Sequence, residues 1–61
     1  MVLVHRFRAW DEAFSAWTIP AVKMTIEHVW AIGGTVLPGT DEYVDPALLD
    51  EQGQYHMPRR A

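Results

Sequence analysis

The sequence contains no cysteine, so no disulfide can cross-link this 61-residue chain and the commonest zinc ligand is missing. No apolar run approaches the roughly 18 residues that a membrane-spanning helix requires, and we expect no membrane partner. An excess of positive charge is missing too, because five Lys and Arg stand against eight Asp and Glu, for a net charge of −3 with neutral histidine. We therefore expect no general electrostatic attraction to nucleic acid or to anionic lipid.

The chain is also short for a stable fold. For this size, apolar burial and the entropic cost of ordering each come to roughly 90 kcal/mol, at about 25 cal/mol per Å² and about 1.5 kcal/mol per residue, so the two nearly cancel. Small domains usually gain the missing stability from disulfides, a structural metal or a partner. Because disulfides are excluded and 49% of the residues are hydrophobic, we expect the chain to associate with itself or with another protein.

The N-terminal segment lacks the character of a secretory signal. Residues 1–10 carry their arginines after the apolar start and lack an apolar core of about seven residues. A chain without cysteine also suits a reducing compartment. We expect a cytoplasmic protein.

The first third of the chain predicts an antiparallel β-hairpin. Residues 2–10 are rich in β-branched and aromatic side chains that alternate with others, which indicates a strand with Leu3 and Phe7 facing inward. Residues 13–19 suit a second strand that pairs with the first after a turn longer than two residues.

The last third predicts a third strand, a helical turn and a tail. The strand at residues 35–44 must be interrupted at 38–39, because proline cannot donate a ladder hydrogen bond. An Asp-Pro pair then favours a short helical turn at 46–51. We expect one α+β domain at residues 1–53 and a frayed, flexible tail at 54–61.

Between the hairpin and the third strand, the pattern predicts one α-helix at residues 20–32, packed on the sheet. Val22, Ile26 and Val29 recur at helical spacing and form one apolar stripe. The first residue of this range is proline, which fits a first helical turn, and two glycines follow its end. A shorter helix capped by Thr25 is the alternative. We favour the longer helix, because the shorter one leaves Val22 off the stripe.

Three strings of the sequence carry a resemblance: RFRAWD at 6–11, TIEHVWAIGGTVLPGT at 25–40, and VD at 44–45. Together they span about two-thirds of the chain and resemble a group of short bacterial proteins to which no activity is assigned. The resemblance implies a strand–strand–helix–strand order and transfers no functional residues. This chain departs from the group's pattern at Ile26 and Trp30, which make its helix surface more apolar.

Nothing in the sequence has the spacing of a catalytic or metal site. The three histidines, at positions 5, 28 and 56, lie in different predicted elements without i, i+3 or i, i+4 spacing. Ser15 is the only serine, and no Gly-x-Ser-x-Gly motif surrounds it. The carboxylates between 41 and 51 suit capping and solvation. We expect no enzyme, no cofactor and no metal, although two carboxylates meeting in a pocket would reopen the question.

Exposed Trp and Met are residue types that protein interfaces use. The sequence has three tryptophans, too many for full burial in so small a core. We identify Trp10, Met24 and Trp30 as candidate interface residues and expect a non-enzymatic protein-interaction module that self-associates. The alternative for Trp30 is that its ring folds down over the edge of the sheet.

A second hypothesis concerns Arg6, Arg8 and Trp10, which fall on one face of the first predicted strand. Basic and aromatic residues on a sheet face are how such surfaces hold single-stranded nucleic acid. The acidic net charge disfavours this hypothesis. An ordinary solvated strand face, with its arginines paired to neighbouring acids, is the competing interpretation.

Overall fold

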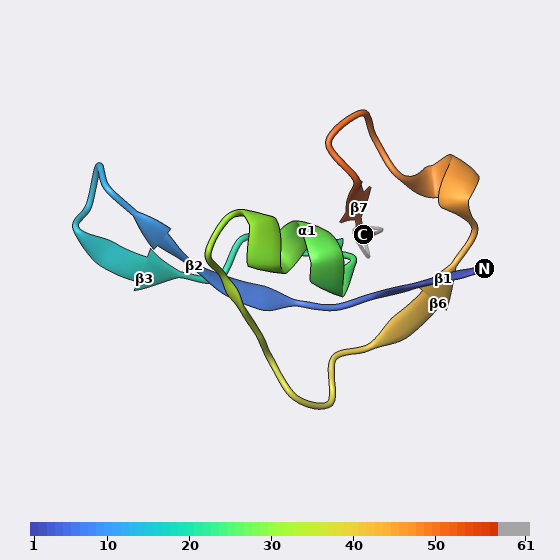
Figure 1. The fold of residues 1–61 in the computed structure, drawn as a ribbon, viewed down its shortest axis with the longest axis horizontal. Helices are drawn as coiled ribbons and strands as arrows, with labels where there is room; N and C mark the ends of the chain where they lie inside the picture. Colours follow the sequence, from blue (N-terminus) through green and yellow to red (C-terminus); the bar gives the residue numbers. More distant parts are fainter. Residues whose placement is uncertain (58–61) are drawn as a thin grey trace, which may run out of the picture.

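The computed structural model describes residues 1–57 and shows short antiparallel sheets with one helix, as expected for an α+β domain. Figure 1 shows a small body built around the helix, from which one hairpin projects. The elements in chain order are β1 (Val2–Val4), β2 (Phe7–Asp11), β3 (Ala16–Thr18), β4 (Val22–Met24), α1 (Ile26–Ala31), β5 (Thr35–Val36), β6 (Glu42–Val44), the 3₁₀ turn η1 (Pro46–Leu48) and β7 (Gln54–His56).

The predicted first strand is two strands, β1 and β2, which follow one another along the length of the molecule (Figure 1). They are separated at His5 and Arg6, whose backbones bond in different directions. His5 exchanges both backbone hydrogen bonds with Met24 of β4, whereas the carbonyl of Arg6 accepts from the N–H of Leu37. Val4 and Phe7 are both buried although they are three residues apart. The inward-facing side therefore changes between β1 and β2, and only Phe7 of the predicted Leu3 and Phe7 pair is fully buried.

The predicted third strand is interrupted as expected. Each of its two halves pairs with one half of the predicted first strand. β5 pairs antiparallel with β2, and β6 pairs antiparallel with β1. Between them the chain loops out through Pro38 and Gly39, the second with a φ of 75° that favours glycine. The helical turn is confirmed at Pro46–Leu48, where the Asp45 carboxylate accepts a hydrogen bond from the N–H of Ala47 at 2.9 Å.

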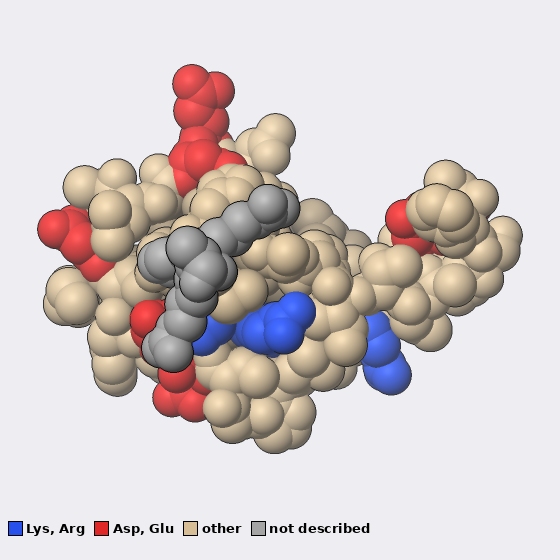
Figure 2. All heavy atoms as spheres, turned by 180° about the vertical axis from the view of Figure 1, so that it is seen from behind, with Lys and Arg blue, Asp and Glu red and all other residues tan. Residues whose placement is uncertain are grey.

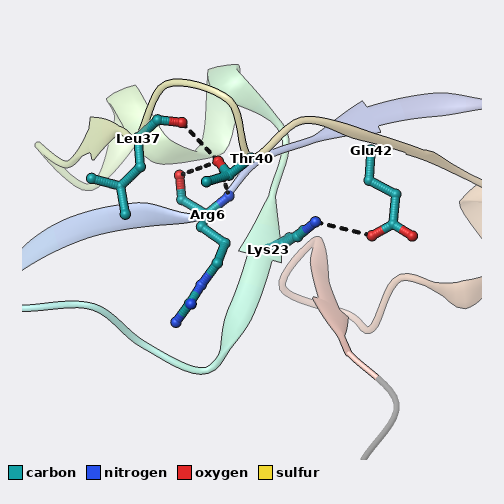
Figure 3. Close-up of polar contacts among 5 residues, drawn as sticks. All are labelled: Arg6, Lys23, Leu37, Thr40 and Glu42. Atoms are coloured by element: carbon teal, nitrogen blue, oxygen red, sulfur yellow. Dashed lines mark hydrogen bonds and ion pairs between the residues drawn. The ribbon is translucent and has the colours of Figure 1, made fainter.

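Thr40 bridges the gap that this loop leaves in the ladder (Figure 3). Its hydroxyl accepts a hydrogen bond from the N–H of Arg6 at 3.0 Å and donates to the carbonyl of Leu37 at 2.7 Å. A half-buried backbone N–H without a partner is costly. The threonine thus replaces the strand residue that would otherwise pair with Arg6.

The predicted helix over residues 20–32 was wrong at its start, and the alternative start at Thr25 is the one observed. α1 spans Ile26–Ala31, with Thr25 extended as its N-cap residue. Val22 belongs instead to β4, which bonds to β7 on one side and reaches His5 on the other. Val22 still packs in the same cluster as Val29. The pattern therefore correctly predicted that Val22 packs against the core, but the β4–β7 ladder and the bridge from Met24 to His5 hold this segment as a strand.

The C-terminal segment was expected to fray from residue 54, and this was wrong for its first part. Gln54–His56 form β7, which pairs with β4, and Tyr55 is buried. Tyr55 also bridges to Leu49. The sequence is too polar here to suggest a strand, and only the available edge of β4 makes one. The rest of the predicted tail, residues 58–61, lies outside the described residues.

The core consists of two adjoining clusters. Phe7 of β2, Met24 of β4 and Val29 of α1 form the cluster under the helix. Val4, Val44 and Tyr55 form the other, toward β6 and β7. Because each cluster has only three buried residues, the stability of the fold depends on few side chains.

The hairpin of β2 and β3 extends outward from the first of these clusters (Figure 1). Residues 12–15 form its turn, in which Ser15 takes a left-handed φ of 47° and the Asp11 carboxylate accepts from the N–H of Ala13. The predicted hairpin is confirmed, but its second strand begins at Ala16 and not at residue 13. The turn is longer than the sequence pattern indicated, because Phe14 belongs to its tip.

Candidate functional site

Three aromatic side chains are exposed on the projecting hairpin. Trp10 of β2 is 51% exposed, Trp17 of β3 is 49% exposed, and Phe14 at the turn is 77% exposed. Large apolar side chains gathered on one projecting element are typical of interaction sites. We call these three residues the hairpin aromatics.

The alternation of β2 explains why these side chains are outside. Phe7 and Ala9 face the body, so Arg8 and Trp10 must face away from it. The ladder sets Trp10 directly opposite Trp17, which places both indoles on the outer face. Burial of Phe7 therefore dictates the exposure of Trp10.

The two indoles pack against each other edge to face. Their ring centroids lie 5.5 Å apart with an interplanar angle of 77°, an arrangement that adds about 0.5–1.5 kcal/mol to the hairpin. The guanidinium carbon of Arg8 lies 5.0 Å from the centroid of Trp17, a cation–π contact. The two indoles are thus packed against each other while both residues remain about half exposed.

The structure separates the three predicted interface residues. Trp10 lies on the outer face of the hairpin, and Trp30 of α1 is 65% exposed, so its ring does not fold down over the sheet. Met24 was a wrong choice: it lies in β4, and only 4% of it is exposed. The assumed helix placed Met24 away from the core, whereas the strand turns it inward. Among the described residues, the aromatic partner of Trp10 is Trp17 and not Trp30.

The predicted nucleic-acid residues are brought together only in part. Arg8 and Trp10 share the outer face of β2, but Arg6 lies before it, is half-buried, and has a buried Nε without a hydrogen-bond partner in the described part of the chain. Its side chain points away from Thr40 (Figure 3). Lys23 is engaged by Glu42, with Nζ 3.1 Å from the carboxylate. On the face drawn in Figure 2, basic and acidic groups lie near one another.

Sequence reasoning missed Trp17 and Phe14 as site residues. The expected strands at residues 2–10 and 13–19 set Trp10 across from Ala13, and the pairing with Trp17 requires the four-residue turn at 12–15. The exposure of Phe14 follows from the same turn, in which Ser15 is in the left-handed region. Turn length is set by this local conformation and not by the apolar pattern.

A polar cluster at the other end of the molecule involves Asp50. Its carboxylate accepts from the N–H groups of Gln54 and Gln52 and lies 2.8 Å from Nε2 of His56. These bonds, the one from Gln54 first, hold the pKa of Asp50 below its ordinary value of 3.8. The Asp50 carboxylate thus ties the turn after η1 to β7.

Residues 1–57 show no pocket, and no three histidine or carboxylate side chains gather there as around a metal ion. Nor does this part of the chain contain a helix with the length and apolar character to cross a bilayer.

Comparison with known proteins gives no further guide to the site. No family model matches the chain, and no curated protein and no solved structure is significantly similar to it. The resemblance to short bacterial proteins stays a prediction. The case for a function therefore depends on the surface of the chain itself.

Proposed function

We propose that this chain is a small, non-enzymatic protein-interaction module that self-associates through its hairpin. The observation that carries this proposal is the exposure of Trp10, Trp17 and Phe14 on an element that projects from the body. Tryptophan is among the residues enriched at the energetic centres of interfaces. The edge-to-face packing of Trp10 and Trp17 stabilises the hairpin and leaves both residues about half exposed, so a partner can still bury them.

The body of the domain supports the same proposal. Within residues 1–57 its two clusters contain six buried hydrophobic residues, whereas nine large hydrophobic residues are exposed. For so short a chain, burial of part of this surface in a complex supplies stability that the monomer lacks.

Sedimentation velocity from micromolar to millimolar concentration tests self-association. The expected result is a concentration-dependent shift from the mass of one chain to that of two. The double substitution of Trp10 and Phe14 by serine should move this shift to higher concentration, and Trp30→Ser, which removes an exposed tryptophan outside the hairpin, should not. A single-chain mass throughout the range contradicts the proposal.

Binding of single-stranded nucleic acid is the second candidate. The observation in its favour is that Arg8 packs on Trp17 beside Trp10, since stacked arginine and aromatic side chains are how sheet surfaces hold unpaired bases. This candidate predicts that the wild-type chain shifts single-stranded RNA or DNA at low salt and releases it as salt rises. Replacing both Arg6 and Arg8 by glutamine should abolish that shift. No shift of the wild-type chain at low salt removes this candidate.

A further inference from the structure

The edges of the sheets differ in how they are protected against pairing. β6 carries the charged residue Glu42, β5 has two residues and is soon followed by Pro38, and the outer side of β7 is bridged by Leu49. β3 is also short and is followed two residues later by Pro20, but Ala16–Thr18 itself contains no charge and no proline, and in the described part of the chain its outer side has no partner strand. An unprotected edge is a template for another strand.

We propose that β3 pairs with β3 of a second copy of the chain, antiparallel about a two-fold axis at Trp17. The order β3–β2–β5 then becomes one six-stranded sheet across two copies. This inference rests on the proposed function and adds the edge and the register of the association. Each residue of a three-residue strand has a partner in the other copy only when the middle residue lies on the axis. Ala16 then faces Thr18 of the other copy, and Trp17 faces Trp17.

This register matches apolar side chains beyond the strand itself. Continuing the ladder in both directions brings Phe14 of one copy beside Ile19 and Pro20 of the other. Phe14 and Ile19 are both exposed in the single chain. By symmetry this contact forms twice, once on each side of the central Trp17 pair. At each place Phe14 of one copy covers Ile19 of the other, and both are exposed in the single chain.

The charges near the hairpin are compatible with the same register. Arg8 lies at the base of the hairpin, one step beyond the Ala9–Thr18 pair. Glu12 lies in the turn, and antiparallel pairing brings the turn of one copy to the base of the other. Opposite charges therefore approach one another at both ends, and the uncharged β3 strands meet without like-charge repulsion.

The hairpin aromatics alone supply less than half of the area that a stable dimer needs. The hairpin aromatics present roughly 350 Å² of ring surface, given that each such side chain can bury about 150–250 Å². A stable interface takes about 800 Å² from each partner. Ile19, the turn and the exposed backbone edge of β3 lie alongside and extend the contact.

A charge swap at Trp17 tests this arrangement in the full chain. Trp17→Glu and Trp17→Lys each place like charges on the two-fold axis, so each should raise the dimer Kd by about 30-fold or more. Mixing the two variants in equal amounts should restore a heterodimer, because glutamate then faces lysine. The same pair of substitutions at Trp30 is the matched control and should leave the Kd unchanged. Sedimentation velocity gives the Kd, and amide spectra confirm that each variant is folded.

Phe14→Ser provides a second test that leaves the strand pairing of the hairpin intact, and it should raise the Kd several-fold. If Trp17→Glu, Trp17→Lys and Phe14→Ser all dimerise with the Kd of the wild type, the inference is overturned. Self-association by another surface would then still stand. Failure of the mixed Trp17 variants to recover a heterodimer overturns the two-fold register at Trp17. A wild-type chain that stays monomeric overturns both this inference and the proposed function, and leaves the edge of β3 to a strand of another protein.

Discussion

The body of the domain and the projecting β2–β3 hairpin differ in where the aromatic side chains of β2 lie: Phe7 is buried in the body and Trp10 is exposed on the hairpin. Phe7, at the base of the hairpin, is 1% exposed and packs against Met24 and Val29. Trp10, on the same strand, lies on the opposite face, where it packs against its cross-strand neighbour Trp17 and is 51% exposed. The difference shows that one strand serves two purposes: its inner face holds the fold together and its outer face is available for a partner.

The largest effect is expected when one phenylalanine in each region is replaced by alanine and the losses of stability are compared. Phe7→Ala removes a buried side chain and should cost about 3–5 kcal/mol, while a domain of this size rarely has more than about 3–5 kcal/mol to lose. The variant should therefore be largely unfolded in circular dichroism and urea titration. Phe14→Ala should change the free energy of unfolding by less than about 0.5 kcal/mol when measured below the dimer Kd. Equal losses at the two positions would contradict the division into body and hairpin.

Thr40→Val tests the junction between the two halves of the first strand. It leaves the N–H of Arg6 without its hydrogen-bond acceptor and should lower the free energy of unfolding by about 1–3 kcal/mol. Thr40→Ser retains the hydroxyl and is the matched control. Urea titration gives both values, and a serine variant as unstable as the valine variant would mean that the methyl group and not the hydroxyl matters.

A smaller effect is expected at the turn of the hairpin. Ser15 has a φ of 47°, a conformation that costs a residue with a Cβ atom more than it costs glycine. Ser15→Gly should therefore raise the free energy of unfolding by about 0.5–1 kcal/mol. Thermal melting measures the change, and a lower melting temperature for the glycine variant would show that the turn does not hold this conformation in solution.

The smallest effect is expected at Asp50, in the body, and it depends on pH. Because folding lowers the pKa of Asp50, its carboxylate stabilises the fold above the unfolded pKa of about 4, and this contribution is lost as the pH falls through the folded value. Melting temperatures of the wild type and of Asp50→Asn should differ near neutral pH and converge only when the pH has fallen through the folded pKa of Asp50, which lies below 3.8. A difference that is the same at every pH would mean that ionisation of Asp50 plays no part.

Local sequence signals were sufficient to predict several elements. The β2–β3 hairpin, the interruption of the third strand and the Asp45 cap of η1 were all predicted, because proline, a carboxylate before proline and strict alternation act over a few residues. The exposure of Trp10 follows in the same way, from the inward position of Phe7. These features depend on the stereochemistry of neighbouring residues, which can be inferred from the sequence without knowing the fold.

Long-range pairing decided the rest. Val22–Met24 has helical spacing with Ile26 and Val29, yet its backbone enters ladders with β7 and His5, which are far away in the sequence. That single competition shortened the helix, buried Met24 and turned Gln54–His56 into a strand. It could not be read from the sequence, because the free energy of a strand depends on which neighbour supplies its hydrogen bonds, and only the folded chain brings that neighbour into place.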